Sequence, residues 1–191
     1  MFVLLIIKDY SNLYVVKNVS NDLSPLFSAT SLWAGQAGSL LLWAWILSLY
    51  VLISVPKSLK KILPASKIAG GFVLVFFLYL ISFVESPFEM TSEQITNGRG
   101  LNPILQNIYM SIHPLSLYLG YISLTIPFSF ALGALISKDG SSDWIKLSKK
   151  WTYFSWTFLS IGLLLGSRWA YLELGWGGYW AWDPVENVAL M

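Results

Sequence analysis

The chain has 191 residues, of which 55% are hydrophobic and only 12% are charged, with a formal net charge of +2. About a quarter of the residues in a soluble domain are charged, so this composition excludes an ordinary soluble domain. The absence of cysteine excludes disulfides, zinc–thiolate sites and thiol chemistry, and lysines confined to short connections do not form a nucleic-acid surface.

The first segment, Met1–Ile7, is apolar but too short to cross a bilayer. It has neither a basic n-region nor a small-residue cleavage site, so it is not a signal peptide. We expect it to be the last part of a transmembrane helix that begins upstream.

Four later intervals contain no charged residue: 23–56, 68–84, 100–137 and 151–167. Each can hold the roughly 20 apolar residues that a transmembrane helix needs, and continuous rather than alternating apolar runs favour helices over barrel strands. The sequence therefore predicts an all-α fold: a polytopic transmembrane bundle of about four complete spans, with partial spans at both ends, forming one membrane domain over residues 1–191. The predicted spans are Ser39–Val55, Ile68–Val84, Pro114–Ile136 and Trp151–Trp169.

Lysines mark two of the connections between these spans. By the positive-inside rule both connections are cytoplasmic, and the connections 8–38, 85–112 and 170–183 are extracytoplasmic. The lysines are Lys57, Lys60, Lys61 and Lys67 in one connection, and Lys138, Lys146, Lys149 and Lys150 in the other.

His113 is the only histidine of the chain. Because Pro114 follows it, we expect His113 to lie just before the third span, at its extracytoplasmic end. The positive end of the helix dipole favours the neutral imidazole, which is the form that binds metals. The alternative is an interfacial histidine that bonds water or lipid headgroups.

A tryptophan-rich loop, residues 170–187, follows the fourth span. It contains Trp176-Gly177-Gly178-Tyr179-Trp180-Ala181-Trp182-Asp183-Pro184-Val185-Glu186-Asn187. Three indoles around a flexible glycine pair suit a large planar ligand, whereas interfacial belts account for much of the other aromatic content. We expect belt or packing roles for Trp43, Trp45, Trp144, Trp151 and Trp169. Trp33, on the same predicted face as the loop, is either a helix-entry anchor or a further wall of the ligand site.

The acidic residues of this loop have two interpretations. Asp183 and Glu186 are candidate metal ligands or proton-transfer groups, but their spacing around Pro184 is also that of a helix N-cap. The helix would start at Pro184, and Val188–Met191 would then begin a fifth span. We therefore expect the chain to be an internal piece of a larger multi-pass protein.

Two arginines on the predicted outer side are candidate partners for a carboxylate-bearing ligand. Arg99 is the only cation of the 85–112 connection, and an ordinary turn arginine is the alternative. Arg168 lies near the outer end of the fourth span, where it is also placed to extend its charge toward water.

The tryptophan-rich motif resembles the "WWD" signature of haem-handling proteins in cytochrome c biogenesis. The ending Asp183-Pro184-Val185-Glu186-Asn187 is similar to that of the CcmF/NrfE haem lyases. Three further stretches resemble the same family, although many relatives have His-Glu where this chain has Gln36-Ala37. They are Gly35-Gln36-Ala37-Gly38-Ser39-Leu40-Leu41-Leu42-Trp43, Gly98-Arg99-Gly100-Leu101-Asn102-Pro103-Ile104-Leu105-Gln106, and Ile112-His113-Pro114 with Leu117-Tyr118-Leu119-Gly120-Tyr121.

The resemblance implies a haem on the extracytoplasmic face, with His113 as one axial iron ligand. A second axial histidine, and the ligands of a separate haem b within the membrane, would lie beyond Met191. Without them, we do not expect this chain to be active by itself. The resemblance and the placement of charges together give the candidate haem contacts Trp176, Gly177, Gly178, Trp180, Trp182, Asp183, Arg99 and Arg168.

The implied activity is that of a haem lyase, which joins haem vinyl groups to the thiols of a Cys-x-x-Cys-His segment of apocytochrome c. The implied partners are haem, the apocytochrome, a haem-delivery chaperone and other maturation subunits. The implied location is a bacterial inner membrane, with archaeal or organellar membranes as further options. Two alternatives stay open: a haem delivery or export protein without ligation activity, and a haem-free scaffold or permease.

Overall fold

The computed structural model describes residues 1–54, 60–175 and 177–191, so Val55, Lys57 and Trp176 lie outside the described residues. Within these ranges the chain is all-α, as predicted, apart from an isolated bridge between Asn12 and Met90. The elements are α1 (Phe2–Ile7), α2 (Leu13–Asn18), α3 (Pro25–Thr30), the 3-10 turn η1 (Ser31–Trp33), α4 (Gln36–Ile53), α5 (Leu63–Phe83), the 3-10 turn η3 (Pro103–Leu105), α6 (Ile108–Ser123), α7 (Thr125–Ile136), α8 (Asp143–Glu173) and α9 (Pro184–Leu190).

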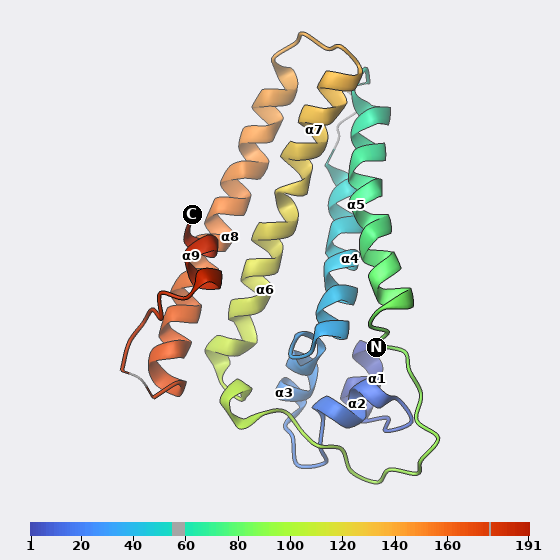
Figure 1. Cartoon of the computed structure of the whole chain (residues 1–191), viewed down its shortest axis with the longest axis vertical. Coiled ribbons are helices and arrows are strands. Elements are labelled where there is room, and N and C mark those ends of the chain that lie inside the picture. The colour runs from blue at the N-terminus through green and yellow to red at the C-terminus, as the bar shows by residue number, and fades with distance from the viewer. Residues whose placement is uncertain (55–59, 176) are drawn as a thin grey trace.

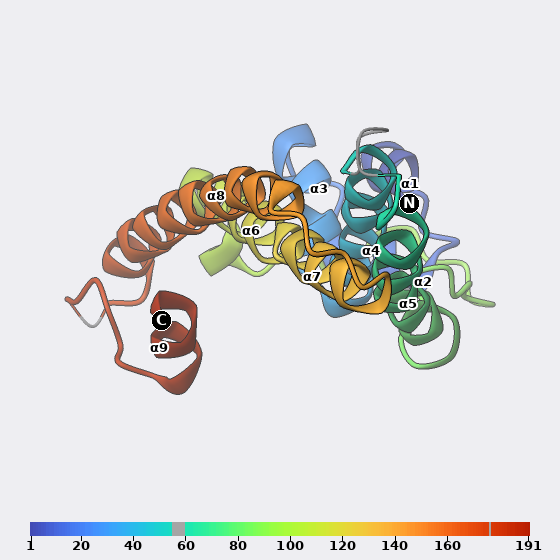
Figure 2. The same ribbon diagram turned by 90° about the horizontal axis from the view of Figure 1, so that it is seen from above.

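The long helices form an open, curved row. Seen from above, the row passes from α8 through α6 and α7 to α4 and α5 (Figure 2). The pairs with the most extensive contact are α6 with α8, α5 with α7 and α4 with α5. The short helices α1, α2 and α3 gather at one end of the row, which is the lower end in Figure 1.

Three of the predicted spans are long and apolar enough to cross a membrane: Gln36–Ile53, Leu63–Phe83 and Ile108–Ile136. The fourth, 151–169, is helical within the 31-residue α8, but among the described helices α8 does not reach the same apolarity. The structure thus has three of the four expected spans as candidate membrane spans, and the fourth as part of a long, less apolar helix. The run 151–167 lacks charges, but Thr152, Thr157 and several Trp and Tyr side chains lower its hydropathy.

The third span is interrupted at Leu124, where α6 ends and α7 begins. Pro127 explains the break, because it has no N–H to donate to the carbonyl of Ser123 and its ring crowds that carbonyl. The predicted single helix 114–136 is thus two helices, and it starts earlier, at Ile108.

The described lysine-rich segments, 60–67 and 137–150, lie at the end of the row opposite to α1–α3 and to the tryptophan-rich loop (Figure 1). The Lys61 Nζ donates to the carbonyl of Lys138 at 3.1 Å and lies 3.5 Å from Asp139 Oδ1. This arrangement is the one that the charge pattern predicts for two connections on the same side of a membrane.

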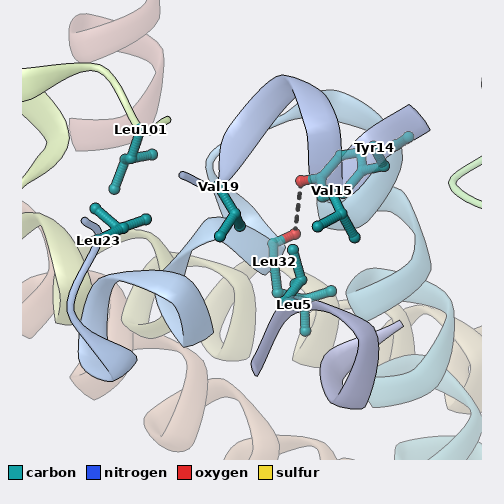
Figure 3. Close-up of a cluster of buried hydrophobic side chains, with 8 residues drawn as sticks. Leu5, Tyr14, Val15, Val19, Leu23, Leu32 and Leu101 are labelled. Atoms are coloured by element: carbon teal, nitrogen blue, oxygen red, sulfur yellow. Dashed lines mark hydrogen bonds between the residues drawn. The ribbon is translucent and has the colours of Figure 1, made fainter. Parts of the chain in front are cut away.

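The short helices form a compact cap with its own apolar core (Figure 3). Tyr14 is the polar centre of this core. Its hydroxyl donates toward the carbonyls of Ser31 and Leu32, at 2.8 and 3.1 Å, and accepts the N–H of Gly35 at 3.1 Å. Gly38 leaves room for the ring, since a Cβ there would lie 2.7 Å from Tyr14 Cζ. The buried core residues are Leu5, Tyr14, Val15, Val19, Leu23, Leu32, Ala37 and Leu101.

The Tyr14→Phe variant should therefore be less stable by about 1–3 kcal/mol, because it removes the hydroxyl that bonds these backbone groups. Burial also raises the pKa of Tyr14 above its usual value. Above a pH of about 10, the unfolded chain loses the Tyr14 proton while the folded chain still keeps it. Deprotonation then favours the unfolded chain, so the contribution of Tyr14 to the free energy of unfolding falls as the pH rises.

Thermal unfolding of wild type and Tyr14→Phe between pH 7 and 11 tests both statements. Tyr153→Phe removes a hydroxyl from an exposed tyrosine of α8 and is the matched control. The difference in melting temperature between the wild type and Tyr14→Phe should become smaller at alkaline pH. Equal melting temperatures at pH 7 would contradict the assigned hydrogen bonds.

Candidate functional site

His113 lies inside α6, not before the helix as the sequence predicts. The helix begins at Ile108, where Asn107 caps it by accepting the N–H of Tyr109 at 2.8 Å. Pro114 then falls in the second turn, where its missing N–H removes one helical hydrogen bond without ending the helix. The residue before a proline is only biased against helical geometry, and here the helix overrides that bias.

The imidazole of His113 is held by one face of α8. Its Nδ1 lies 2.7 Å from the carbonyl oxygen of Gly162. A carbonyl can only accept, so Nδ1 carries the proton and the lone pair is left on Nε2. A protonated ring nitrogen that donates to a backbone carbonyl is the usual second contact of a metal-binding histidine.

Gly166, one turn further along α8, makes room for the ring. A Cβ on Gly166 would lie 2.6 Å from His113 Nδ1, which is well inside van der Waals contact. Trp169 follows on the same face and stacks nearly parallel to the imidazole, with ring centroids 6.5 Å apart and an interplanar angle of 14°.

Trp169 has a more specific position than the belt role expected from the sequence. Its Nε1 donates to the carbonyl of Ile104 at 3.0 Å, so the indole joins η3 to α8 beside His113. The spacing Gly162, Gly166 and Trp169 places these residues on one helix face. Two glycines four residues apart in an apolar helix are a known sign of close helix packing, and this signal was available in the sequence.

The helices α6 and α8 approach closely along their shared length. A Cβ on Gly120 of α6 would lie 2.6 Å from Leu159 Cγ, and a Cβ on Gly162 would lie 2.5 Å from Leu117 Cδ2. Ser155 adds a buried hydrogen bond from its Oγ to the carbonyl of Gly120, at 2.7 Å. These small residues fix the position of His113 relative to α8.

The tryptophan-rich loop turns back beside α8 with several residues in left-handed geometry. Gly175 and Gly177 have φ of 68° and 73°, and Trp182 has φ of 61°. Gly177 has open space where a side chain would be, so its glycine serves the backbone conformation rather than a close contact with another described part of the chain.

Asp183 and Glu186 hold the shape of this loop, which confirms the capping interpretation. Asp183 Oδ1 accepts the N–H of Glu186 at 2.8 Å, which begins α9. Glu186 Oε2 accepts the N–H groups of Ala181 at 2.6 Å and Trp182 at 3.1 Å. Asn187 completes the network, since its side chain accepts from Trp180 Nε1 at 3.2 Å and donates to the carbonyl of Trp182 at 3.1 Å.

A mostly apolar pocket of about 210 Å³ lies between α6, α8 and this loop. It brings His113 together with Trp180, which are far apart in the chain. Ligand pockets usually measure about 300–1,000 Å³, so this one accommodates an edge of a large planar molecule rather than the whole. Trp182 is not part of the lining and is 74% exposed. The lining includes His113, Leu117, Trp169, Leu174, Tyr179 and Trp180.

The two candidate arginines differ in position. Arg168 is exposed, with its guanidinium carbon 5.7 Å from the centre of the Tyr171 ring. Tyr171 in turn stacks on Tyr179 at 4.4 Å and 6°, so Arg168 lies beside the tryptophan-rich loop.

Arg99 is not brought to the pocket. The backbone N–H of Arg99 donates to the carbonyl of Val16 at 2.7 Å, and this hydrogen bond fixes the backbone of Arg99 beside α2 in the N-terminal cap. Gly98 makes this approach possible, since a Cβ there would lie 2.7 Å from the same carbonyl oxygen. The expectation that Arg99 and His113 share one ligand therefore has no support in this arrangement.

Comparisons with known proteins agree on one family. The family described as "Cytochrome C assembly protein" matches residues 33–191. The chain is 38% identical to "Cytochrome c-type biogenesis protein CcmF" of Haemophilus influenzae, over 100% of this chain and 30% of that protein. It is 42% identical to "Cytochrome c-type biogenesis protein ccl1" of Rhodobacter capsulatus, over 96% of this chain and 28% of that protein.

A solved structure is similar over almost the whole chain. It is described as "Cytochrome c Heme Lyase CcmF" and has a TM-score of 0.84 and 32% sequence identity, covering 98% of this chain and 30% of that one. The chain thus spans about 30% of the length of these relatives.

Proposed function

Because the chain belongs to the cytochrome c assembly protein family, we propose that it is the haem-holding part of a haem lyase, which attaches haem covalently to apocytochrome c. The observation that carries this proposal is the pocket shared by His113 and Trp180, in which the Nδ1 of His113 is bound to the Gly162 carbonyl. The solved relative described as a haem lyase has the same fold.

The residues of the pocket suit one side of a haem. His113 offers Nε2 to iron in its neutral form, and the apolar walls and the Trp180 indole suit the porphyrin edge. The 210 Å³ volume covers only part of the macrocycle, in keeping with a chain that spans about 30% of its relatives. Arg168 is positioned to attract a propionate at the rim, whereas Trp182 presents an exposed indole to a second molecule.

The chemistry of attachment belongs to haem and to the apocytochrome. Each cysteine thiol adds across a haem vinyl group, so one thioether forms per vinyl and no atom leaves. The contribution of this chain is to place the haem and to keep it oriented while the Cys-x-x-Cys-His segment approaches. Haem b is thus handled as a substrate, and the partners are the apocytochrome, a haem-delivery chaperone and other maturation subunits.

The charge pattern supports an extracytoplasmic site. The described lysine-rich segments, 60–67 and 137–150, lie at one end of the helices. The tryptophan-rich loop and the start of α6, which contains His113, lie toward the other end (Figure 1). The positive-inside rule assigns the lysine end to the cytoplasm, and this supports a haem site on the extracytoplasmic side.

A haem delivery protein without ligation activity is the second candidate. It would share His113 and the aromatic loop but has no need of the network that follows Asp183. Here Glu186 and Asn187 together make four hydrogen bonds with loop residues 180–182. That network gives the loop a defined shape, which favours the ligation activity.

Substitution of the tryptophans tests the proposal. Trp180→Leu in the intact protein should lower retained haem and holocytochrome c yield by about two- to tenfold, since an aromatic contact contributes about 0.5–1.5 kcal/mol. Trp182→Leu should reduce haem retention less than holocytochrome yield, because Trp182 lies outside the pocket.

Trp45→Leu is the matched control, since Trp45 is an exposed indole in the middle of α4. Haem absorbance of the purified protein and haem staining of the cytochrome give the two readouts. If the double variant Trp180→Leu/Trp182→Leu kept full holocytochrome yield, the loop would be an interfacial anchor rather than a haem platform.

A further inference from the structure

An open groove lies at the lysine end of the row, away from the haem pocket. It measures about 620 Å³ and runs between the last turns of α7 and the start of α8. Its floor is apolar, and its mouth is the connection between the two helices. The lining consists of Ala131, Ala134 and Leu135 of α7, Lys138–Gly140 of the connection, and Trp144 of α8.

The charge around this groove is strongly positive. The described segments 60–67 and 137–150 contain seven lysines and two aspartates. Both aspartates are already engaged: Asp139 by Ser141 Oγ at 2.8 Å and Lys61 at 3.5 Å, and Asp143 by Lys146 at 3.1 Å. The mouth of the groove therefore suits an anion.

Lys138 is the lysine at this mouth. It follows α7 in left-handed geometry, with φ of 48°, and its backbone carbonyl accepts from Lys61. Within the described part of the chain its ammonium group has no hydrogen-bond or ion-pair partner. The side chain is exposed, so it is available to a ligand that lies along α7.

The apolar floor continues onto the outer surface of α7. Leu135 and Ile136 are 75% and 65% exposed in the last turn of a candidate membrane span. Trp144 borders the groove from α8, and indoles favour the headgroup level of a bilayer. A ligand that fits must therefore be apolar along α7 and anionic at Lys138.

We propose that this groove binds an anionic glycerophospholipid, with one acyl chain against Ala131, Ala134 and Leu135 and its phosphate at Lys138. A free phosphate would leave the apolar floor without a ligand, and a zwitterionic lipid would not match the excess positive charge. Basic pockets beside transmembrane helices on the cytoplasmic side are a known form of anionic lipid site.

Native mass spectrometry of the intact protein, extracted in mild detergent and supplied with phosphatidylglycerol or phosphatidylcholine, tests the proposal. Phosphatidylglycerol should be retained preferentially. Lys138→Gln should lower its retention about fivefold, because a lysine near an anionic surface contributes about 1 kcal/mol. Lys150→Gln removes the same charge from an exposed site outside the groove and should have little effect.

A second variant keeps the test independent of charge. Ala131 is exposed, so Ala131→Leu fills the groove without changing the buried core and should also weaken retention of phosphatidylglycerol. Equal retention of the two lipids would overturn the proposal, as would equal losses in Lys138→Gln and Lys150→Gln. Full displacement of the lipid by millimolar inorganic phosphate would also overturn it, since the site would then recognise only phosphate.

Discussion

Replacing His113 by alanine in the intact protein should reduce bound haem more than tenfold and lower the yield of holocytochrome c accordingly. The variant removes the nitrogen that we propose as an axial ligand. Even loss of a residue that merely supports a metal ligand typically reduces metal affinity by 10- to 100-fold. Haem absorbance after purification and haem staining of the cytochrome measure the two effects.

Chemical rescue separates loss of a ligand from damage to the fold. The space that the imidazole vacates lies beside Gly162, Gly166 and Trp169, so added imidazole can occupy the same place. Millimolar imidazole should restore part of the haem absorbance of His113→Ala. Unchanged haem content in the variant would refute an axial role for this residue.

The Gly166→Ala variant should impair haem binding about as severely, although it adds only one methyl group. The new Cβ would lie 2.6 Å from Nδ1 of His113, so the ring must move and release the Gly162 carbonyl. Overpacking of this kind costs about 1–3 kcal/mol. Loss of the hydrogen bond from the imidazole to the Gly162 carbonyl would lower the affinity of the imidazole for the metal further. We expect haem retention to fall at least tenfold.

The chain offers a matched control for this change. Gly71 also lies in a long apolar helix, α5, but a Cβ there meets no atom within 4 Å. Gly71→Ala should therefore leave haem binding unchanged and keep or raise stability, since alanine is the better helix former. If both variants retained haem equally, the close fit between His113 and α8 would have no functional role.

The long helices, and the two connections that lie together at one end of them, could be predicted from the sequence. Runs without charged residues and lysine-rich connections are local features of the sequence. The tryptophan-rich loop was found for the same reason, and its acidic residues were correctly paired with a helix start. The fourth expected span is helical but less apolar than the other three, because a stretch without charged residues can still contain many Trp, Thr and Ser side chains.

The surroundings of His113 were harder to predict because they depend on two helices that meet only in three dimensions. Pro114 suggested a helix start, yet Asn107 begins α6 earlier and carries His113 into the helix. The spacing of Gly162 and Gly166 indicates a close helix contact, but it does not say that α6 is the partner or that Gly166 faces His113. Arg99 was placed near the ligand from its side of the membrane alone, whereas its backbone is fixed to α2.

The close packing of α6 against α8 has a thermodynamic consequence for the proposed binding of haem. Immobilising a side chain costs rotamer entropy, up to about 2 kcal/mol for a flexible residue, and a ligand that must do this loses that amount of affinity. Here the packing of Gly120 against Leu159, and the hydrogen bond from His113 to Gly162, restrict the imidazole when the chain folds. In the proposed function, iron would meet a preorganised nitrogen, which lowers the entropy cost of binding haem over a small contact area.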